Sequence, residues 1–176
     1  MVTIHPDHPF QEPPELRDPV RRWRGRLGGT VSLWTSGVGT GPTGRAGLTV
    51  SSVQVVAGDP GHVIGLLDPD STVTERLLET RTGVVQLLEW RHRGLADAFA
   101  GVAPAPGGLF TLGEWVDTDW GPRLADASSW AGVRLVDGDP TAVGWSVLVD
   151  AVIEHLEVGE EDQPLVHRRG RYVRPT

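Results

Sequence analysis

Hydroxyl side chains follow two predicted strands, at the point where each strand gives way to a turn. Ser51 and Ser52 end the stretch GRAGLTVSS, which is typical of a strand. Ser71 and Thr72 lie in DPDSTVTERL, which is typical of a strand end, a turn and the start of a helix. The first N–H groups of a helix lack intrahelical acceptors and lie at the positive end of its dipole, so they suit an anion. The sequence therefore predicts a site for a phosphorylated cofactor.

Other residues could contact the same ligand. Trp34 alternates with the apolar residues of its predicted strand, so it could face a ligand or a second core. Arg168, Arg169 and Arg171 could attract the phosphates of a nicotinamide cofactor, or could form the charged face of an edge strand. The chain contains no GxSxG, HExxH or P-loop pattern and no cysteine, so hydrolytic and metal chemistry are disfavoured.

The elements that must position these residues are mostly short strands. Alternation predicts one strand over 29–36, and the Gly-, Pro- and Thr-rich residues 37–45 should turn the chain into a second strand over 46–56, which makes a hairpin. The third strand is expected over 62–67, and the helix after it over 73–79, where Thr72 and Glu75 have capping-box spacing.

The second half of the chain continues the pattern. Its expected elements are a strand over 82–90, a helix over 91–101, a loop-rich stretch over 102–125, a hairpin of 130–136 with 141–154, and a short basic strand over 164–175. The return strand of this hairpin would place six apolar residues on one face: Val143, Trp145, Val147, Val149, Ala151 and Ile153. Short strands at regular spacing with small helical insertions predict a mainly β, Greek-key-like barrel.

Composition limits the partners. The 176 residues predict one domain over 21–176, after a proline-rich N-terminal extended arm over 1–20. The net charge of -7 argues against nucleic acid and against an anionic membrane surface. No apolar run is long enough to span a bilayer and no signal peptide is evident, so a cytoplasmic protein is expected.

The order of these segments resembles the flavin reductase-like, FMN-binding split-barrel family. Four stretches carry the resemblance: GLTVSS with the following DP turn, LLDPDSTVTERLLETRTGVVQLL, RGLADAFAG, and PLVHRRGRY near the C-terminus. The resemblance covers roughly residues 22–174. It implies a six-stranded split barrel, a homodimer with flavin near the subunit interface, and reduction of flavin by NADH or NADPH, in some cases for a partner monooxygenase.

The resemblance also assigns roles to residues. It implies that Thr49, Val50, Ser51 and Ser52 line the isoalloxazine and ribityl chain of FMN, or of FAD, largely through backbone groups, and Gln54 could join them. The hydroxyls Ser71 and Thr72 would meet the phosphate. His167 and Arg168 fall in the C-terminal stretch that approaches flavin and nicotinamide in relatives.

Such a reaction needs no catalytic side chain, because the protein supplies stacking geometry and excludes water. Asp68 and Asp70 stand where relatives usually carry basic or polar residues, and His167 is shifted relative to the histidine common in relatives. These departures motivate an alternative, a flavin-binding carrier or sensor without reductase activity. An oxidoreductase that uses a deazaflavin on the same fold is a third hypothesis.

Overall fold

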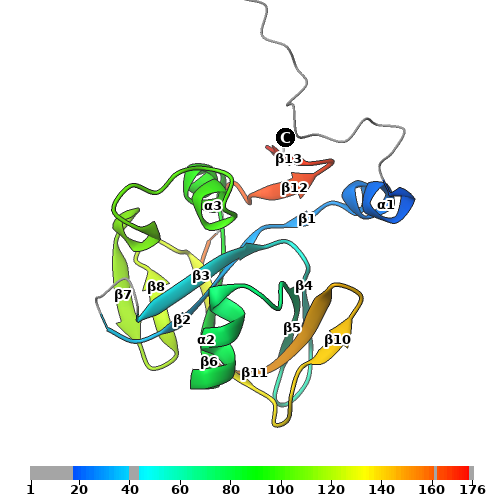
Figure 1. Cartoon of the computed structure of the whole chain (residues 1–176). Coiled ribbons are helices and arrows are strands. Elements are labelled where there is room, and N and C mark those ends of the chain that lie inside the picture. The colour runs from blue at the N-terminus through cyan, green and yellow to red at the C-terminus, as the bar shows by residue number, and fades with distance from the viewer. Residues whose placement is uncertain (1–17, 40–43, 161, 175–176) are drawn as a thin grey trace, which may run out of the picture.

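A computed structural model describes residues 18–39, 44–160 and 162–174 (Figure 1). Its helices are α1 (Pro19–Leu27), α2 (Thr72–Thr80) and α3 (Arg93–Phe99), with the short 3-10 helices η2 (Trp90–His92) and η3 (Leu109–Thr111). Its strands are β1 (Gly29–Thr30), β2 (Ser32–Gly37), β3 (Arg45–Val50), β4 (Val53–Val56), β5 (His62–Leu67), β6 (Thr82–Leu87), β7 (Trp115–Thr118), β8 (Gly121–Leu124), β9 (Ser129–Leu135), β10 (Thr141–Val143), β11 (Ser146–Val158), β12 (Val166–Arg168) and β13 (Arg171–Val173).

The main sheet curls into a barrel. Its strand order is β3-β2-β6-β9-β11-β5-β4, and each of these pairings is antiparallel. The two strands at the ends of this order, β3 and β4, are neighbours in the chain and are separated only by Ser51 and Ser52. If β3 and β4 are counted as one bent strand, six strands surround the core. The predicted six-stranded split barrel with small helical insertions is therefore confirmed.

The bend between β3 and β4 corrects the expectation of one continuous strand over 46–56. Leu48 and Val50 of β3 pair with β2, whereas Val53 of β4 pairs with Gly65 of β5. The chain changes partners at Ser51–Ser52, because a strand that closes a small barrel must leave one neighbour to meet the other. The hairpin of β2 with β3 is as predicted.

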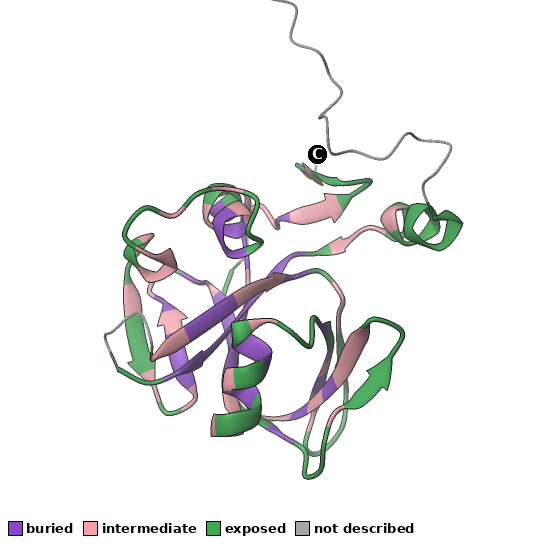
Figure 2. Cartoon of the chain, viewed as in Figure 1, coloured by how far each residue is buried: buried purple, intermediate pink, exposed green. Residues whose placement is uncertain are grey.

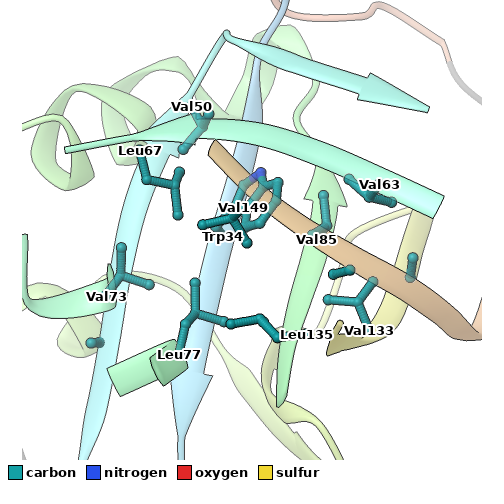
Figure 3. Close-up of a cluster of buried hydrophobic side chains, with 13 residues drawn as sticks. Trp34, Val50, Val63, Leu67, Val73, Leu77, Val85, Val133, Leu135 and Val149 are labelled. Carbon is teal, nitrogen blue, oxygen red and sulfur yellow. The ribbon is translucent and has the colours of Figure 1, made fainter. Parts of the chain in front are cut away.

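One hydrophobic core fills the barrel. Trp34 of β2 lies at its centre with 1% of its surface exposed, and Val63, Val133 and Val149 from three other strands pack around it (Figure 3). Close packing there requires Gly65, since a Cβ atom at that position would lie 2.7 Å from Cζ2 of Trp34. Figure 2 shows the buried residues concentrated along these strands.

Helix α2 closes one side of this core. Val73 and Leu77, one turn apart on the helix, point into the cluster and are 0% and 1% exposed. The helix begins after Ser71, whose hydroxyl accepts the N–H of Thr74 at 3.3 Å, so the cap lies one residue before the predicted Thr72. It ends at Thr80, and the following Arg81 adopts a left-handed conformation and donates its N–H to the carbonyl of Leu77.

A second core lies on the other side of β2. Its buried members include Leu33 of β2, Phe99 of α3, Leu124 of β8 and Leu165, and Phe110 and Trp115 pack against it. The β7–β8 hairpin and η3 lie in the stretch expected to be loop-rich, and together with α3 they cover this face (Figure 1). Both faces of β2 are buried as a result.

The second predicted hairpin is correct in its pairing and wrong in one turn. Strand β11 pairs with β9 and also with β5. The chain turns at Gly144, which has φ of 58°, so Val143 belongs to the separate strand β10 and Trp145 is 94% exposed. Neither side chain therefore lies on the core face that was predicted for them.

The two ends of the described chain meet at a third small sheet. Its order is β1-β12-β13, and Gly29 of β1 pairs with His167 of β12. The basic C-terminal stretch is thus a hairpin, which turns at Arg169 and Gly170. Residues 1–17 of the predicted arm lie outside the described residues. Its last residues begin α1, a helix that the sequence did not predict.

Among the described residues, no helix combines the length and the apolar character that crossing a membrane would need.

Candidate functional site

The bend between β3 and β4 is the centre of the candidate site. The hydroxyl of Ser52 donates to the carbonyl of Leu66 at 2.7 Å, and the carbonyl of Ser52 accepts the N–H of Leu66 at 3.0 Å. On the other side, a Cβ atom at Gly29 would lie 3.2 Å from the carbonyl oxygen of Ser51. The bend is therefore held between the end of β5, which leads to α2, and β1, which pairs with the C-terminal hairpin.

The turn before α2 forms one flank of the site. The carboxylate of Asp68 accepts the N–H of Asp70 at 2.9 Å, which is an Asx-turn. The carbonyl of Asp68 accepts the hydroxyls of Ser71 and Thr74 at 2.9 Å and 2.8 Å. The Asp68 carboxylate is thus engaged by its own backbone, and this reduces its repulsion of a bound phosphate.

The first turn of α2 offers the groups that an anion needs. The hydroxyl of Ser71 caps the Thr74 amide, and the first intrahelical bond runs from the N–H of Glu75 to the carbonyl of Ser71. Within the described part of the chain, the N–H groups of Thr72 and Val73 receive no such acceptor, as is usual for a first helical turn. Thr72 is exposed, and its hydroxyl makes no hydrogen bond with a described residue.

The C-terminal hairpin forms the opposite flank. His167 is half-buried, faces Gly29 across the β1–β12 pair, and contacts the ring of Tyr172 edge to face, with 5.9 Å between the ring centroids. Arg168 is exposed, and its side chain runs past Gly28, where a Cβ atom would lie 3.5 Å from its Cγ. The pair Gly28–Gly29 therefore lets the hairpin approach the bend closely.

Tyr172 pairs with His167 across the C-terminal hairpin. Its burial, then the charge of Asp97, then a hydrogen bond with that carboxylate, raise the pKa of the Tyr172 phenol to about 12. Asp97 belongs to α3, which is also tied to β3, because the Thr49 hydroxyl donates to the carbonyl of Ala96 at 2.7 Å. A chain of contacts thus links β3, α3 and the C-terminal hairpin.

The structure distributes the ten predicted site residues unevenly. It brings Ser51, Ser52, Ser71, Thr72, His167 and Arg168 to the bend and its two flanks. Thr49 lies beside them on β3, half-buried and bonded to α3. The side chain of Val50 is 3% exposed in the core, so only its backbone could meet a ligand.

Two predicted residues lie apart from this group. Trp34 is a core residue, and its indole N–H donates to the hydroxyl of Ser32 at 3.1 Å, so the ligand-facing alternative is corrected. Gln54 is exposed on β4 beyond the bend, paired with Ile64 of β5.

Sequence reasoning missed the basic residues of α1. The helix contains Arg21, Arg22, Arg24 and Arg26, no acidic residue, and no buried side chain. It contacts the C-terminal hairpin through the carbonyl of Gly25, which accepts the N–H of Arg169 at 2.7 Å. The density of arginine in PVRRWRGRL was the available signal, but nothing in the sequence links residue 25 to residue 169.

The family model described as a flavin reductase like domain matches residues 24–176. An FMN reductase (NADH) RutF of Variovorax paradoxus is 28% identical over 166 residues, which cover 93% of this chain and 89% of the relative. FMN reductase (NADH) RutF 2 of Methylorubrum extorquens is 30% identical over 138 residues, with 78% and 68% covered.

Solved structures share the fold. The flavin reductase PheA2 in its native state superposes with a TM-score of 0.78 at 18% identity, covering 91% of this chain and 99% of that one. The NADH:FAD oxidoreductase SgcE6 of Streptomyces globisporus C-1027 gives a TM-score of 0.77 at 22% identity, with 93% and 98% covered.

Proposed function

The chain belongs to the flavin reductase like domain family, and we propose that it is an NAD(P)H:flavin oxidoreductase. The activity for which its relatives are named, FMN reductase with NADH, supports FMN as the flavin and NADH as the reductant. The observation that carries the proposal is the β3–β4 bend, which has a hydroxyl- and amide-bearing turn on one flank and His167 on the other.

The residues at the α2 flank fit the phosphate of FMN. The hydroxyl of Thr72 and the first-turn N–H groups can donate to a phosphate, and the Asp68 carboxylate is occupied by the N–H of Asp70. The backbone of Ser51 and Ser52 would lie along the ribityl chain and the ring. When bound, FMN supplies the acceptor for the hydride of the nicotinamide.

The contribution of the protein is positional. Ser52 is fixed by two hydrogen bonds to Leu66, and His167 is fixed by β1 and by the ring of Tyr172. The two flanks would hold the flavin and nicotinamide rings against each other and exclude water between them, which is what hydride transfer demands. No side chain is required to give or take a proton.

The test is a visible absorption spectrum, followed by a measurement of the rate of NADH oxidation. Purified protein mixed with FMN and desalted should keep the flavin absorption bands, and NADH should then be oxidised when free FMN is present. NADPH, FAD and a deazaflavin are run in parallel to decide among the reductants and flavins. Absence of both retained flavin and NADH oxidation would reject the proposal.

The rival function is a flavin carrier or sensor without turnover. One observation favours it: the Asp70 carboxylate is exposed beside the candidate phosphate position and has no hydrogen-bond partner among the described residues. Retained flavin with no oxidation of NADH or NADPH would select this rival.

A homodimer and a monooxygenase partner complete the proposal. Val20, Trp23 and Leu27 form an exposed stripe along α1, at 67%, 68% and 69% exposure, and apolar stripes of this kind support contact with another protein. A monooxygenase partner is supported by the flavin reductase of the styrene monooxygenase of Pseudomonas putida S12, which shares the fold with a TM-score of 0.76 at 19% identity.

Cell fractionation would test the cytoplasmic location expected from the sequence.

A further inference from the structure

The cations of this chain are concentrated where α1 meets the C-terminal hairpin. Every one of the 16 basic residues is arginine, and four lie in α1 while four lie in residues 168–174. Neither segment contains a carboxylate. Removing these eight cations from a net charge of -7 leaves -15 for the rest of the chain, so the basic surface is strongly segregated.

Four arginines at this junction have no ion-pair partner among the described residues. Arg21, Arg22, Arg168 and Arg169 are exposed, and none makes an ion pair or a side-chain hydrogen bond with any residue in the ranges 18–39, 44–160 and 162–174. Elsewhere the pattern differs: Arg45, Arg91 and Arg134 each pair with a carboxylate. A set of free guanidinium groups in an acidic protein is an anion-binding surface.

The helix places two of its arginines toward the hairpin. The N–H of Arg169 bonds to Gly25, so Gly25 marks the face of α1 that lies on the hairpin. Arg21 and Arg22 are four and three residues before Gly25 and share its face, whereas Arg24 and Arg26 are its immediate neighbours and point to the flanks.

This surface adjoins the His167 flank of the candidate site. Arg168 follows His167 directly, and its side chain lies against Gly28. The next residue, Gly29, lies close to the carbonyl oxygen of Ser51. The α2 turn, which fits the flavin phosphate, lies on the opposite side of the bend. An anion at the arginines is therefore a different group from the phosphate at α2.

We propose that Arg21, Arg22, Arg168 and Arg169 bind the pyrophosphate of the nicotinamide dinucleotide while its nicotinamide ring lies at His167. The inference rests on the proposed function and adds the part of the substrate that α1 recognises. Guanidinium groups bind phosphate oxygens in pairs and through charge, which makes arginine suited to this task.

The test is calorimetric titration of NAD⁺, the unreactive form, into the full chain and into the variant Arg21→Gln/Arg22→Gln. The Kd should rise about fivefold or more, the ratio expected when an exposed charge-assisted contact is lost. Affinity of the wild type for NAD⁺ should fall with added salt, and the variant should show a smaller fall. Nicotinamide riboside, which carries no phosphate, should bind both proteins equally.

The matched control is Arg24→Gln/Arg26→Gln, which removes the same charge from the flanks of the same helix. Because α1 buries no side chain, both variants should keep the wild-type circular dichroism spectrum. An equal loss of NAD⁺ affinity in the control would overturn the inference, since net charge and not a placed site would explain it. A rise in the Kd of FMN without a rise for NAD⁺ would also overturn it.

Failure of the inference is distinct from failure of the proposed function. A wild-type protein that oxidises NADH, with an Arg21→Gln/Arg22→Gln variant that binds NAD⁺ as tightly as the wild type, refutes only the arginine site. A wild-type protein that binds NAD⁺ through these arginines but does not turn over NADH refutes the reductase.

Discussion

Single hydrogen bonds decide how the candidate site accommodates its acidic residues. A carboxylate at Asp68 is expected to weaken a phosphate site, because it repels a phosphate. The Asp68 carboxylate accepts the N–H of Asp70, so it stabilises the turn before α2. Asp70 keeps a free carboxylate among the described residues, so Asp70→Asn should tighten FMN binding about twofold to tenfold, measured as the Kd of FMN by fluorescence quenching. Unchanged affinity would show that Asp70 lies away from the phosphate.

Tyr172 offers a second residue-level prediction, which is clean because the chain has a single tyrosine. Burial and Asp97 raise the pKa of its phenol to about 12, from an ordinary value of 10.0. A raised phenol pKa stabilises the fold fully below pH 10.0, and this contribution is lost as the pH rises toward 12. Ultraviolet titration of tyrosinate should find the raised pKa in the native protein, a lower one in Asp97→Asn, and the ordinary value in denaturant.

At the scale of elements, the first turn of α2 separates a structural hydroxyl from a functional one. Ser71→Ala removes the helix cap and should lower the free energy of unfolding by about 1 kcal/mol, measured by urea denaturation. Thr72→Ala leaves the cap intact and should weaken FMN binding with little change in stability. Equal stability losses in the two variants would contradict the assignment of the cap to Ser71.

Two carboxylates of β11 accept indole N–H groups, and the bond to Trp120 fastens the β7–β8 hairpin to the sheet, whereas the bond to Trp130 joins β9 to β11. Glu154 accepts the indole N–H of Trp120 at 2.7 Å and pairs with Arg134, and Glu157 accepts that of Trp130 at 2.8 Å. Arg134 first, then Trp120, lower the pKa of Glu154, and Trp130 first, then His155, lower that of Glu157.

A lowered carboxyl pKa stabilises the fold above the ordinary value of 4.5, and this contribution is lost as the pH falls through the folded-state pKa. The wild type should therefore lose stability below pH 4.5, and Glu154→Gln/Glu157→Gln should show a shallower loss in urea denaturation at stepped pH. Glu160→Gln, an exposed carboxyl with no bonded partner in the described chain, is the control and should follow the wild type.

The β2 strand shows why the sequence could not assign every residue. Alternation of apolar and polar residues distinguishes the inward face of a strand only when the other face is exposed to solvent. Both faces of β2 are buried, so the pattern found the strand and could not decide the role of Trp34. The helix α2 and strand β5 were predicted well because caps and apolar spacing are local. The change of strand partner at Ser51–Ser52 and the contact of α1 with Arg169 are tertiary, and local spacing carries no signal for them.

At the scale of the whole molecule, assembly is the main expectation. A homodimer should sediment at twice the 19.0 kDa of the chain. Trp23→Ser/Leu27→Ser, in the exposed stripe of α1, should shift the equilibrium toward monomer, since burial of apolar surface drives association. Trp145→Ser, at a more exposed tryptophan outside this stripe, is the control and should sediment as the wild type does. A monomeric wild type would remove the dimer from the proposal.

Four of the seven tryptophans fall into two optical classes. Trp34 and Trp130 are 1% and 6% exposed, whereas Trp23 and Trp145 are 68% and 94% exposed. A collisional quencher dissolved in the buffer will therefore extinguish the emission of Trp145 first, and that of Trp23 wherever no partner covers α1, and will leave a blue-shifted remainder from the buried tryptophans. That remainder reports whether the barrel is intact, while the quenchable light of Trp23 reports what approaches α1. The intrinsic fluorescence of the unlabelled protein thus reports separately on the barrel core and on the surface of α1.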